Sequence, residues 1–130
     1  MQIEQISIFM ENKSGQLAEI TSALSEADIE IRAMILVDNS DFGVLRMIVD
    51  DPKTTKKFLK HQGYVVSSAP VFMVEQDNNS TQIHDVLDLM NNAEINVEYM
   101  YAFANMEKNN TVMIFMVNNP EKAMQVLKQK

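Results

Sequence analysis

Ala27-Asp28-Ile29-Glu30-Ile31 and Ala93-Glu94-Ile95-Asn96-Val97 are two versions of one pattern, spaced 66 positions apart. The match extends in both directions along the chain. Upstream, apolar positions at helical spacing coincide, and downstream the offset becomes 68, where the two Pro-containing segments 49–52 and 117–120 coincide. Ordered self-similarity of this kind predicts an internal duplication. We therefore predict two units, residues 1–68 and residues 69–130.

The first copy has the periodicity of alternating strands and helices. Apolar residues alternate over 6–10, 29–37 and 44–49, which is typical of strands, and they have helical spacing from Leu17 to Ala27. Asp51-Pro52 is a strong helix start, and residues 64–66 form a short fourth strand. The resulting order, βαββαβ, predicts an α+β fold of two ferredoxin-like units with antiparallel sheets. Placed side by side, two such units share a longer sheet.

The second copy departs from the first at its end. No strand is predicted after its last helix, which leaves an open sheet edge. Two interpretations remain open here: another element, for example from a second chain, covers this edge, or the sequence ends early. Residues 67–70, Ser-Ser-Ala-Pro, are the only candidate for a linker between the units.

Composition excludes several classes of function. The 130 residues carry 11 basic and 18 acidic side chains, a net charge of −7 that is spread over both halves. Neither half is expected to offer a basic stripe to phosphates, so nucleic acid is not an expected partner. No apolar run is long enough for a membrane span, and the N-terminus does not resemble a secretory signal. With no cysteine present, a cytoplasmic location is expected.

Catalysis has little support in the sequence. The two histidines, His61 and His84, stand on predicted helices without a nucleophile at a suitable spacing. Three glycines cannot form a Gly-rich phosphate loop, and Asp50-Asp51 is explained by helix capping. We therefore expect no enzyme activity, no catalytic residue, no metal site and no cofactor.

Residues 8–20, Ile-Phe-Met-Glu-Asn-Lys-Ser-Gly-Gln-Leu-Ala-Glu-Ile, resemble the first strand, loop and helix of an ACT domain, whose loop usually reads Asp/Asn-x-Pro-Gly followed by Leu. Residues 95–103 are similar to the second strand of stand-alone proteins with two tandem ACT domains. The resemblance implies a regulatory sensor of a free amino acid. It also implies that the ligand lies between two ACT units, against the loop of one and the second strand of the other.

The loop of the first copy has the chemistry that such a ligand needs. Free N–H groups at a helix start suit a carboxylate, Gly15 permits close approach, and the Asn12 side chain can accept from an ammonium group. The alternative is structural: Asn12 and Ser14 cap the helix and Gly15 forms the turn. The candidate residues of this loop are Asn12, Lys13, Ser14, Gly15, Gln16 and Leu17.

The second copy has no glycine in its loop, and Thr81 stands in the matching position. We expect the first loop to bind better than the second. The expected partner surface is the strand segment Glu98, Tyr99, Met100 and Tyr101. The alternative is that both tyrosines fill the core on the helix-facing side, with Glu98 and Met100 on the other face.

The methionines suggest a further surface. By alternation, Met34 and Leu36 lie on the face away from the helices, and Leu45 and Met47 are candidates for the same face. A partly apolar open face favours a homodimer, although simple core use of these residues explains them equally well. The predicted function is an amino acid sensor whose partner is an enzyme or a transcription factor. The alternative is a protein-interaction module without a small ligand.

Overall fold

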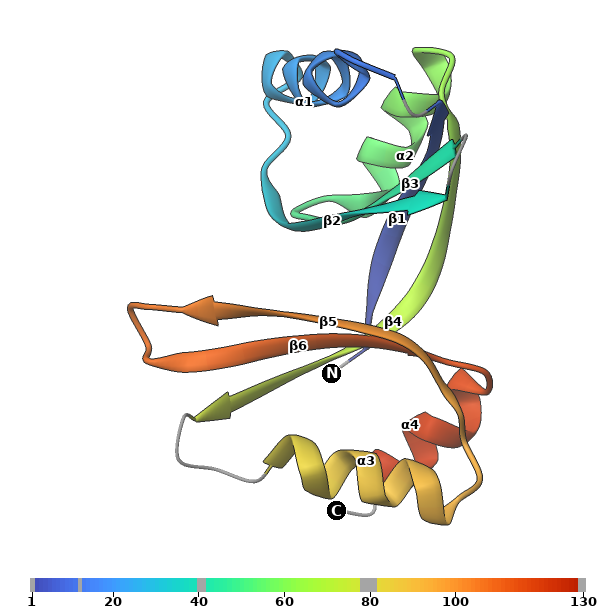
Figure 1. Cartoon of the computed structure of the whole chain (residues 1–130), viewed down its shortest axis with the longest axis vertical. Helices are drawn as coiled ribbons and strands as arrows, with labels where there is room; N and C mark the ends of the chain where they lie inside the picture. The colour runs from blue at the N-terminus through green and yellow to red at the C-terminus, as the bar shows by residue number, and fades with distance from the viewer. Residues whose placement is uncertain (1, 12, 40–41, 78–81, 129–130) are drawn as a thin grey trace. The chain divides into compact units, whose positions relative to one another are not determined.

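The computed structural model describes residues 2–11, 13–39, 42–77 and 82–128 (Figure 1). The elements are β1 (Gln2–Glu11), α1 (Gln16–Glu26), β2 (Ile31–Asn39), β3 (Phe42–Val49), α2 (Pro52–His61), β4 (Val65–Asp77), α3 (Gln82–Asn92), β5 (Val97–Asn105), β6 (Asn110–Val117) and α4 (Pro120–Lys128). They form two compact units, residues 4–69 and residues 1–3 with 70–130. Strands β1 and β4 each contribute to both units.

In the unit of residues 4–69, the strand order is β2-β3-β1-β4, and β3 pairs antiparallel with both β1 and β2. Helices α1 and α2 cover one face of these strands (Figure 1). Nine buried apolar residues form the core between sheet and helices: Ile6, Ile8, Met10, Ile20, Leu24, Leu45, Met47, Val49 and Leu59. This arrangement of two helices over an antiparallel sheet is the ferredoxin-like fold.

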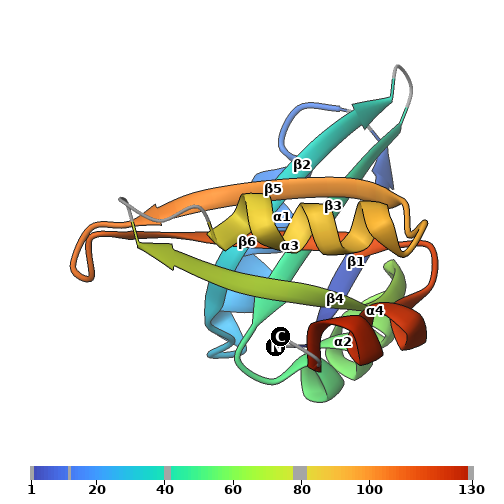
Figure 2. The ribbon, with the colours of Figure 1, turned by 90° about the horizontal axis from the view of Figure 1, so that it is seen from below.

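The unit of residues 1–3 and 70–130 repeats this architecture. Strand β6 pairs antiparallel with β4 and β5, and α3 and α4 lie over one face (Figure 2). Phe72 and Phe115 stack in its core with ring centroids 5.7 Å apart. No strand follows α4 within the described residues. Beside β4 lies β1, whose first residues belong to this unit.

The two copies share backbone details as well as element order. Each has a register shift at the start of its second strand, between Ile31 and Ala33 in β2 and between Val97 and Tyr99 in β5. In each copy an acidic residue with a left-handed backbone also follows the first helix, Asp28 after α1 and Glu94 after α3. These features recur at an offset of 66, as in the sequence match. The predicted fold of tandem ferredoxin-like units is confirmed.

The register shift overturns the predicted face of four apolar residues. Met34 pairs with Met47, and Leu36 pairs with Leu45. Paired residues of antiparallel strands project from the same face. Leu45 and Met47 belong to the core under the helices, so all four residues face the helices and not the opposite side. The extra residue of a bulge reverses the alternation beyond it, which the sequence pattern does not reveal.

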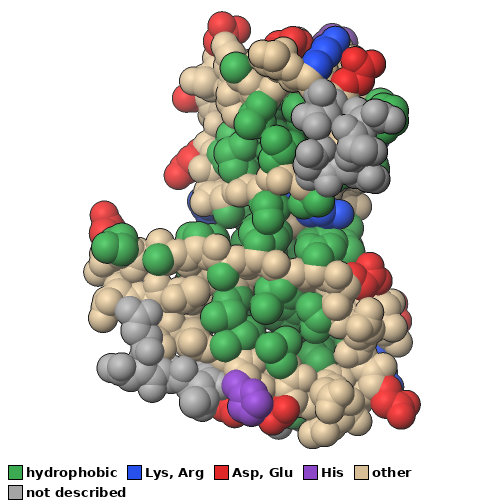
Figure 3. Space-filling model, in the orientation of Figure 1, with side chains coloured by type: hydrophobic (Ala, Val, Ile, Leu, Met, Phe, Trp, Pro, Cys, Tyr) green, Lys and Arg blue, Asp and Glu red, His purple; other side chains and the backbone are tan. Residues whose placement is uncertain are grey.

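Met34 and Leu36 are nevertheless 40% and 44% exposed, because they lie on the edge strand β2. Met100, at the matching position of β5, is 44% exposed. Figure 3 shows hydrophobic side chains gathered between the helices and the strands in each unit, on the side toward the viewer. The apolar surface that favoured a homodimer therefore lies on the helix side of the edge strands.

The predicted linker contains the boundary between the two units, which falls between Ala69 and Pro70, but it has strand structure. Ser67, Ser68, Ala69 and Pro70 lie inside the continuous strand β4. Proline and alanine are depleted in strands, but pairing with neighbouring strands decides the structure of such a segment. Proline is tolerated where no backbone N–H is needed for the ladder.

Candidate functional site

The loop that follows β1 is short and bonded to itself. The backbone N–H of Lys13 donates to the Glu11 carbonyl at 2.9 Å, and the Lys13 ammonium lies 3.3 Å from the Glu11 carboxylate. Lys13 and Ser14 are exposed, whereas Gln16 and Leu17 are half-buried. Leu17 packs against the core of its unit, so it anchors the start of α1.

Gly15 is the N-cap residue of α1 and has a left-handed backbone, with φ 88° and ψ −13°. A Cβ at this position would meet no atom within 4 Å. This left-handed backbone conformation therefore explains why residue 15 is a glycine, because other residues adopt such a conformation only with strain. No side chain caps this helix start within the described residues. The interpretation of Ser14 as a helix cap is thus wrong, and Asn12 lies outside the described residues.

The missing cap leaves donors at the start of α1. The Gln16 N–H makes a long 3.4 Å bond to the Lys13 carbonyl, and the first bond of the helix proper joins Glu19 N–H to the Gly15 carbonyl at 3.0 Å. Within the described residues, the N–H groups of Leu17 and Ala18 have no acceptor. The Gln16 side-chain oxygen is buried and also has no partner among the described residues. Backbone N–H donors beside a side-chain oxygen acceptor suit a zwitterion, whose carboxylate accepts from the donors and whose ammonium donates to the oxygen.

One contact ties the first turn of α1 to the segment before β4. The Tyr64 hydroxyl donates to the Glu19 carboxylate at 3.0 Å. Partial burial raises the pKa of Tyr64, and the Glu19 carboxylate raises it further. The hydroxyl therefore stays protonated at neutral pH and holds Glu19 in place.

The four predicted strand residues lie together on the edge strand β5, in the other unit from the loop. Their predicted faces are wrong because of the register shift. Tyr99 pairs with Met116 and Tyr101 with Ile114, whereas Met100 pairs with Phe115 of the helix-side core. Met100 therefore lies on the helix side and both tyrosines lie on the opposite side. Glu98 lies at the register shift and is exposed.

The second copy closes the corresponding helix start. The Ile83 N–H, near the beginning of α3, donates to the Gln76 side-chain oxygen at 2.7 Å. Gln76 extends from β4 of the same unit, so a side chain of the protein already occupies this donor. Residues 78–81, including Thr81, lie outside the described residues. The helix starts of the two copies therefore differ in available donors.

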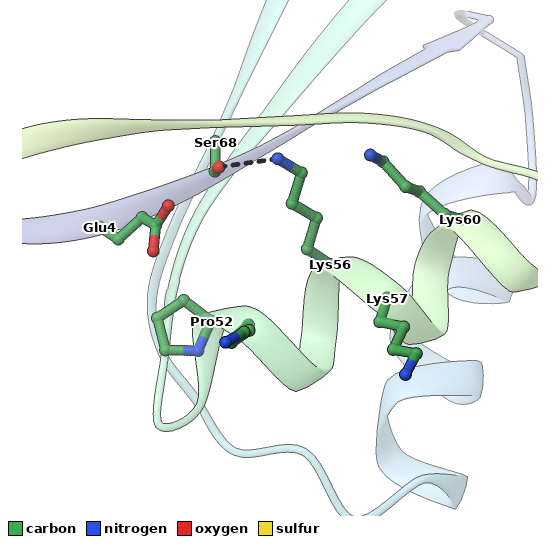
Figure 4. A pocket seen from close by; sticks show the side chains of 7 residues that line it. Glu4, Pro52, Lys56, Lys57, Lys60 and Ser68 are labelled. Carbon is green, nitrogen blue, oxygen red and sulfur yellow. Dashed lines mark hydrogen bonds between the residues drawn. The ribbon is translucent and has the colours of Figure 1, made fainter.

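A cavity of about 420 Å³ lies along α2 and was not predicted from the sequence. Its lining residues are Glu4, Pro52, Lys53, Lys56, Lys57, Lys60 and Ser68 (Figure 4). The expectation that neither half offers a basic stripe is wrong here. The total charge of each half does not reveal this lysine cluster. The four lysines are spaced by three, one and three residues, however, and that spacing predicts that they share one helical face.

The described residues contain neither a metal cluster nor a helix that could span a membrane. No three His, Asp or Glu side chains come together there as a possible metal cluster. Equally, none of the helices in the described ranges is both long and apolar enough to cross a membrane.

Two ferredoxin-like units in tandem, with a glycine loop at the first helix, define the class of protein to which this chain belongs. The family model described as "ACT domain pair" matches residues 1–130, and the chain belongs to that family. The resemblance inferred from the loop is thereby confirmed. No curated protein matches the sequence.

Solved structures extend the comparison. Protein BT0572 from Bacteroides thetaiotaomicron is 36% identical with a TM-score of 0.89, and the match covers 99% of this chain and 88% of that one. The ligand-free regulatory subunit of aspartate kinase from Thermus thermophilus is 15% identical with a TM-score of 0.63, over 97% and 91% of the two chains. The corresponding subunit from Thermus flavus is 13% identical with a TM-score of 0.62, over 99% and 94%. At these identities, the two subunits support the fold alone.

Proposed function

We infer that this protein is a regulatory sensor that binds a free amino acid at the start of α1. The observation that carries the proposal is the uncapped helix start behind Gly15, with the N–H groups of Leu17 and Ala18 unbonded among the described residues. Membership of the ACT domain pair family supports it. No catalytic role, metal or cofactor is part of the proposal.

The ligand's carboxylate accepts from the Leu17 and Ala18 N–H groups, where the helix dipole also favours negative charge. Its ammonium donates to the Gln16 side-chain oxygen, which lacks a partner, or to Asn12. Gly15 allows the ligand to reach the backbone because it carries no Cβ. Lys13 and Ser14 border the loop and are exposed to an incoming ligand.

A second strand supplies the other wall of the site, and its proposed residues are Glu98, Tyr99, Met100 and Tyr101 of a second copy within a homodimer. The exposed Met100 and its counterpart Met34 on the edge strands support a role in recognising an apolar ligand side chain. Ligand binding favours the form in which both walls contact it. That change in population acts in the cytoplasm on an enzyme or a transcription factor.

The first experiment is a thermal-shift panel of the twenty amino acids on the purified protein, followed by calorimetric titration of each hit. A ligand at 100 times its Kd adds about 2.7 kcal/mol to the free energy of unfolding. For a domain of this size, that is a rise of roughly 10 °C in Tm. A flat panel would contradict the proposal and favour an interaction module without a small ligand.

Gly15→Val and Gly63→Val form a matched pair for the binding site. Both glycines have positive φ, 88° and 94°, and neither has an atom within 4 Å of an added Cβ. Each substitution therefore strains the backbone at a cost of roughly 1–3 kcal/mol without a clash. Gly15→Val is expected to abolish binding of the hit, whereas Gly63→Val retains it. Equal affinity of the two variants would remove the loop from the site.

A further inference from the structure

A separate feature of the unit of residues 4–69 is the cavity along α2. Four of its seven lining side chains are lysines, at positions 53, 56, 57 and 60, and its only carboxylate is Glu4. Its volume of about 420 Å³ is within the range of small-molecule sites. This concentration of positive charge contrasts with the chain's net charge of −7.

Three of the four lysines have no acidic partner among the described residues. Within the described part of the chain, Lys56, Lys57 and Lys60 form no ion pair, and the Lys56 ammonium donates to the Ser68 hydroxyl at 3.0 Å. Figure 4 shows the Lys56 and Lys60 side chains turned toward the strand segment of Ser68, with Lys57 turned the other way. Two ammonium groups and a hydroxyl thus border one space with donors available.

The second copy indicates that the fold does not require three of these four lysines. At the offset of 68 that relates α2 to α4, Lys53 corresponds to Glu121, Lys56 to Met124 and Lys57 to Gln125, whereas Lys60 corresponds to Lys128. Both helices nevertheless begin with the same capped proline turn and pack against the same kind of sheet. The combination of four lysines on one helical face is therefore specific to α2.

We propose that this cavity binds a small, multiply charged anion that carries two or more phosphate groups. Lysine ammonium groups bind phosphate oxygens as point charges, and several of them around one concave space favour a ligand with several negative charges. The limited volume and the flanking Glu4 favour a small molecule over a polymer. The site is distinct from the start of α1 and gives the sensor a second input.

The test is calorimetric titration of the full chain with inorganic tripolyphosphate at low ionic strength, since salt screens such contacts. Binding is expected in the wild type. The double variant Lys56→Gln with Lys60→Gln is expected to weaken it at least about tenfold, as loss of hydrogen bonds to charged groups predicts. The control, Lys108→Gln with Lys128→Gln, removes the same charge from exposed positions of the other unit and retains affinity.

Glu4→Gln sharpens the test, because removal of the cavity's carboxylate is expected to tighten binding of a polyanion severalfold. Weaker binding would mean that the ligand brings a cation to Glu4, and would overturn the proposal. So would an absence of binding by wild type, or equal losses in the two double variants. Tighter binding of a short oligonucleotide with the same dependence on Lys56 and Lys60 would identify a polymer as the ligand instead. Circular dichroism checks that each variant is folded.

Discussion

The first helix of each copy starts differently, although the copies agree in most other details. In α3 the Gln76 side chain accepts from the Ile83 N–H at 2.7 Å, whereas in α1 no side chain of the described residues takes this role. The register shift in the second strand and the left-handed residue after the first helix are present in both copies. Each copy thus serves as an internal control for the other.

Features shared by both copies are those that the fold needs in order to form. Features found in one copy alone, such as the open helix start of α1 and three of the four lysines on α2, are not required for folding. They are therefore the better candidates for function. Both copies have the same architecture and pack the same kind of core, so the comparison between them can be made within this one chain.

The largest expected effects concern the two cores. Leu24 and Met90 occupy equivalent helix positions and are almost fully buried. Leu24→Ala and Met90→Ala are each expected to lower the free energy of unfolding by about 3 kcal/mol, since truncation leaves a cavity. Because β1 and β4 contribute to both units, we expect each variant to shift one common transition in urea unfolding followed by circular dichroism.

Lys108→Ala, on an exposed residue, is the control for these variants and should stay within about 0.5 kcal/mol of wild type. Two separate transitions, with each core variant shifting only one, would mean that the copies unfold independently.

A smaller effect is expected at the helix starts themselves. Gln76→Ala removes the acceptor for the Ile83 N–H and is expected to cost about 1 kcal/mol, the usual value for loss of a helix cap. Ser14→Ala, at the start of α1, removes a side chain that makes no cap and is expected to be nearly neutral. Urea midpoints at neutral pH compare the two. A larger loss for Ser14→Ala would contradict the difference between the copies.

The sequence predicted the order of elements well and the faces of two strands poorly. Periodicity, turn residues and the repeat were enough for βαββαβ, because each signal is local. The register shifts in β2 and β5 were not predictable, since the extra residue is accommodated by pairing with the neighbouring strand. The extra residue in β2 reversed the predicted faces of Met34 and Leu36, and the extra residue in β5 reversed those of Tyr99 and Tyr101.

In the candidate loop, too, some features were predictable from the sequence and others were not. Glycine followed by an amphipathic helix predicted an exposed helix start, and Gly15 is the N-cap of α1. The sequence did not reveal that Ser14 makes no cap. Nor did it reveal that Gln76, six residues before Gln82, closes the second helix start. Both depend on where a side chain lies relative to a turn, which periodicity does not describe.

The smallest expected effect distinguishes the caps of α2 and α4. The Asp51 carboxylate accepts from the Thr54 N–H at 3.2 Å and from the Thr54 hydroxyl at 2.8 Å, whereas in α4 the Asn119 amide accepts from the Lys122 N–H at 3.2 Å. The hydrogen bond from the Thr54 side chain, followed by that from its backbone, lowers the pKa of Asp51. Of these two caps, only that of α2 therefore titrates.

A folded-state pKa below the unfolded value of about 3.9 means that the Asp51 cap stabilises the protein above that pH. The contribution is lost as the pH falls through the lowered, folded-state pKa. Asp51→Asn is thus expected to make stability less steeply dependent on pH below about 4, and Asn119→Asp to make it more steeply dependent. Urea midpoints measured between neutral and acidic pH give the slopes. Identical slopes for both variants and wild type would mean that the Thr54 bonds to Asp51 do not persist in solution, and that the two caps are equivalent despite their different chemistry.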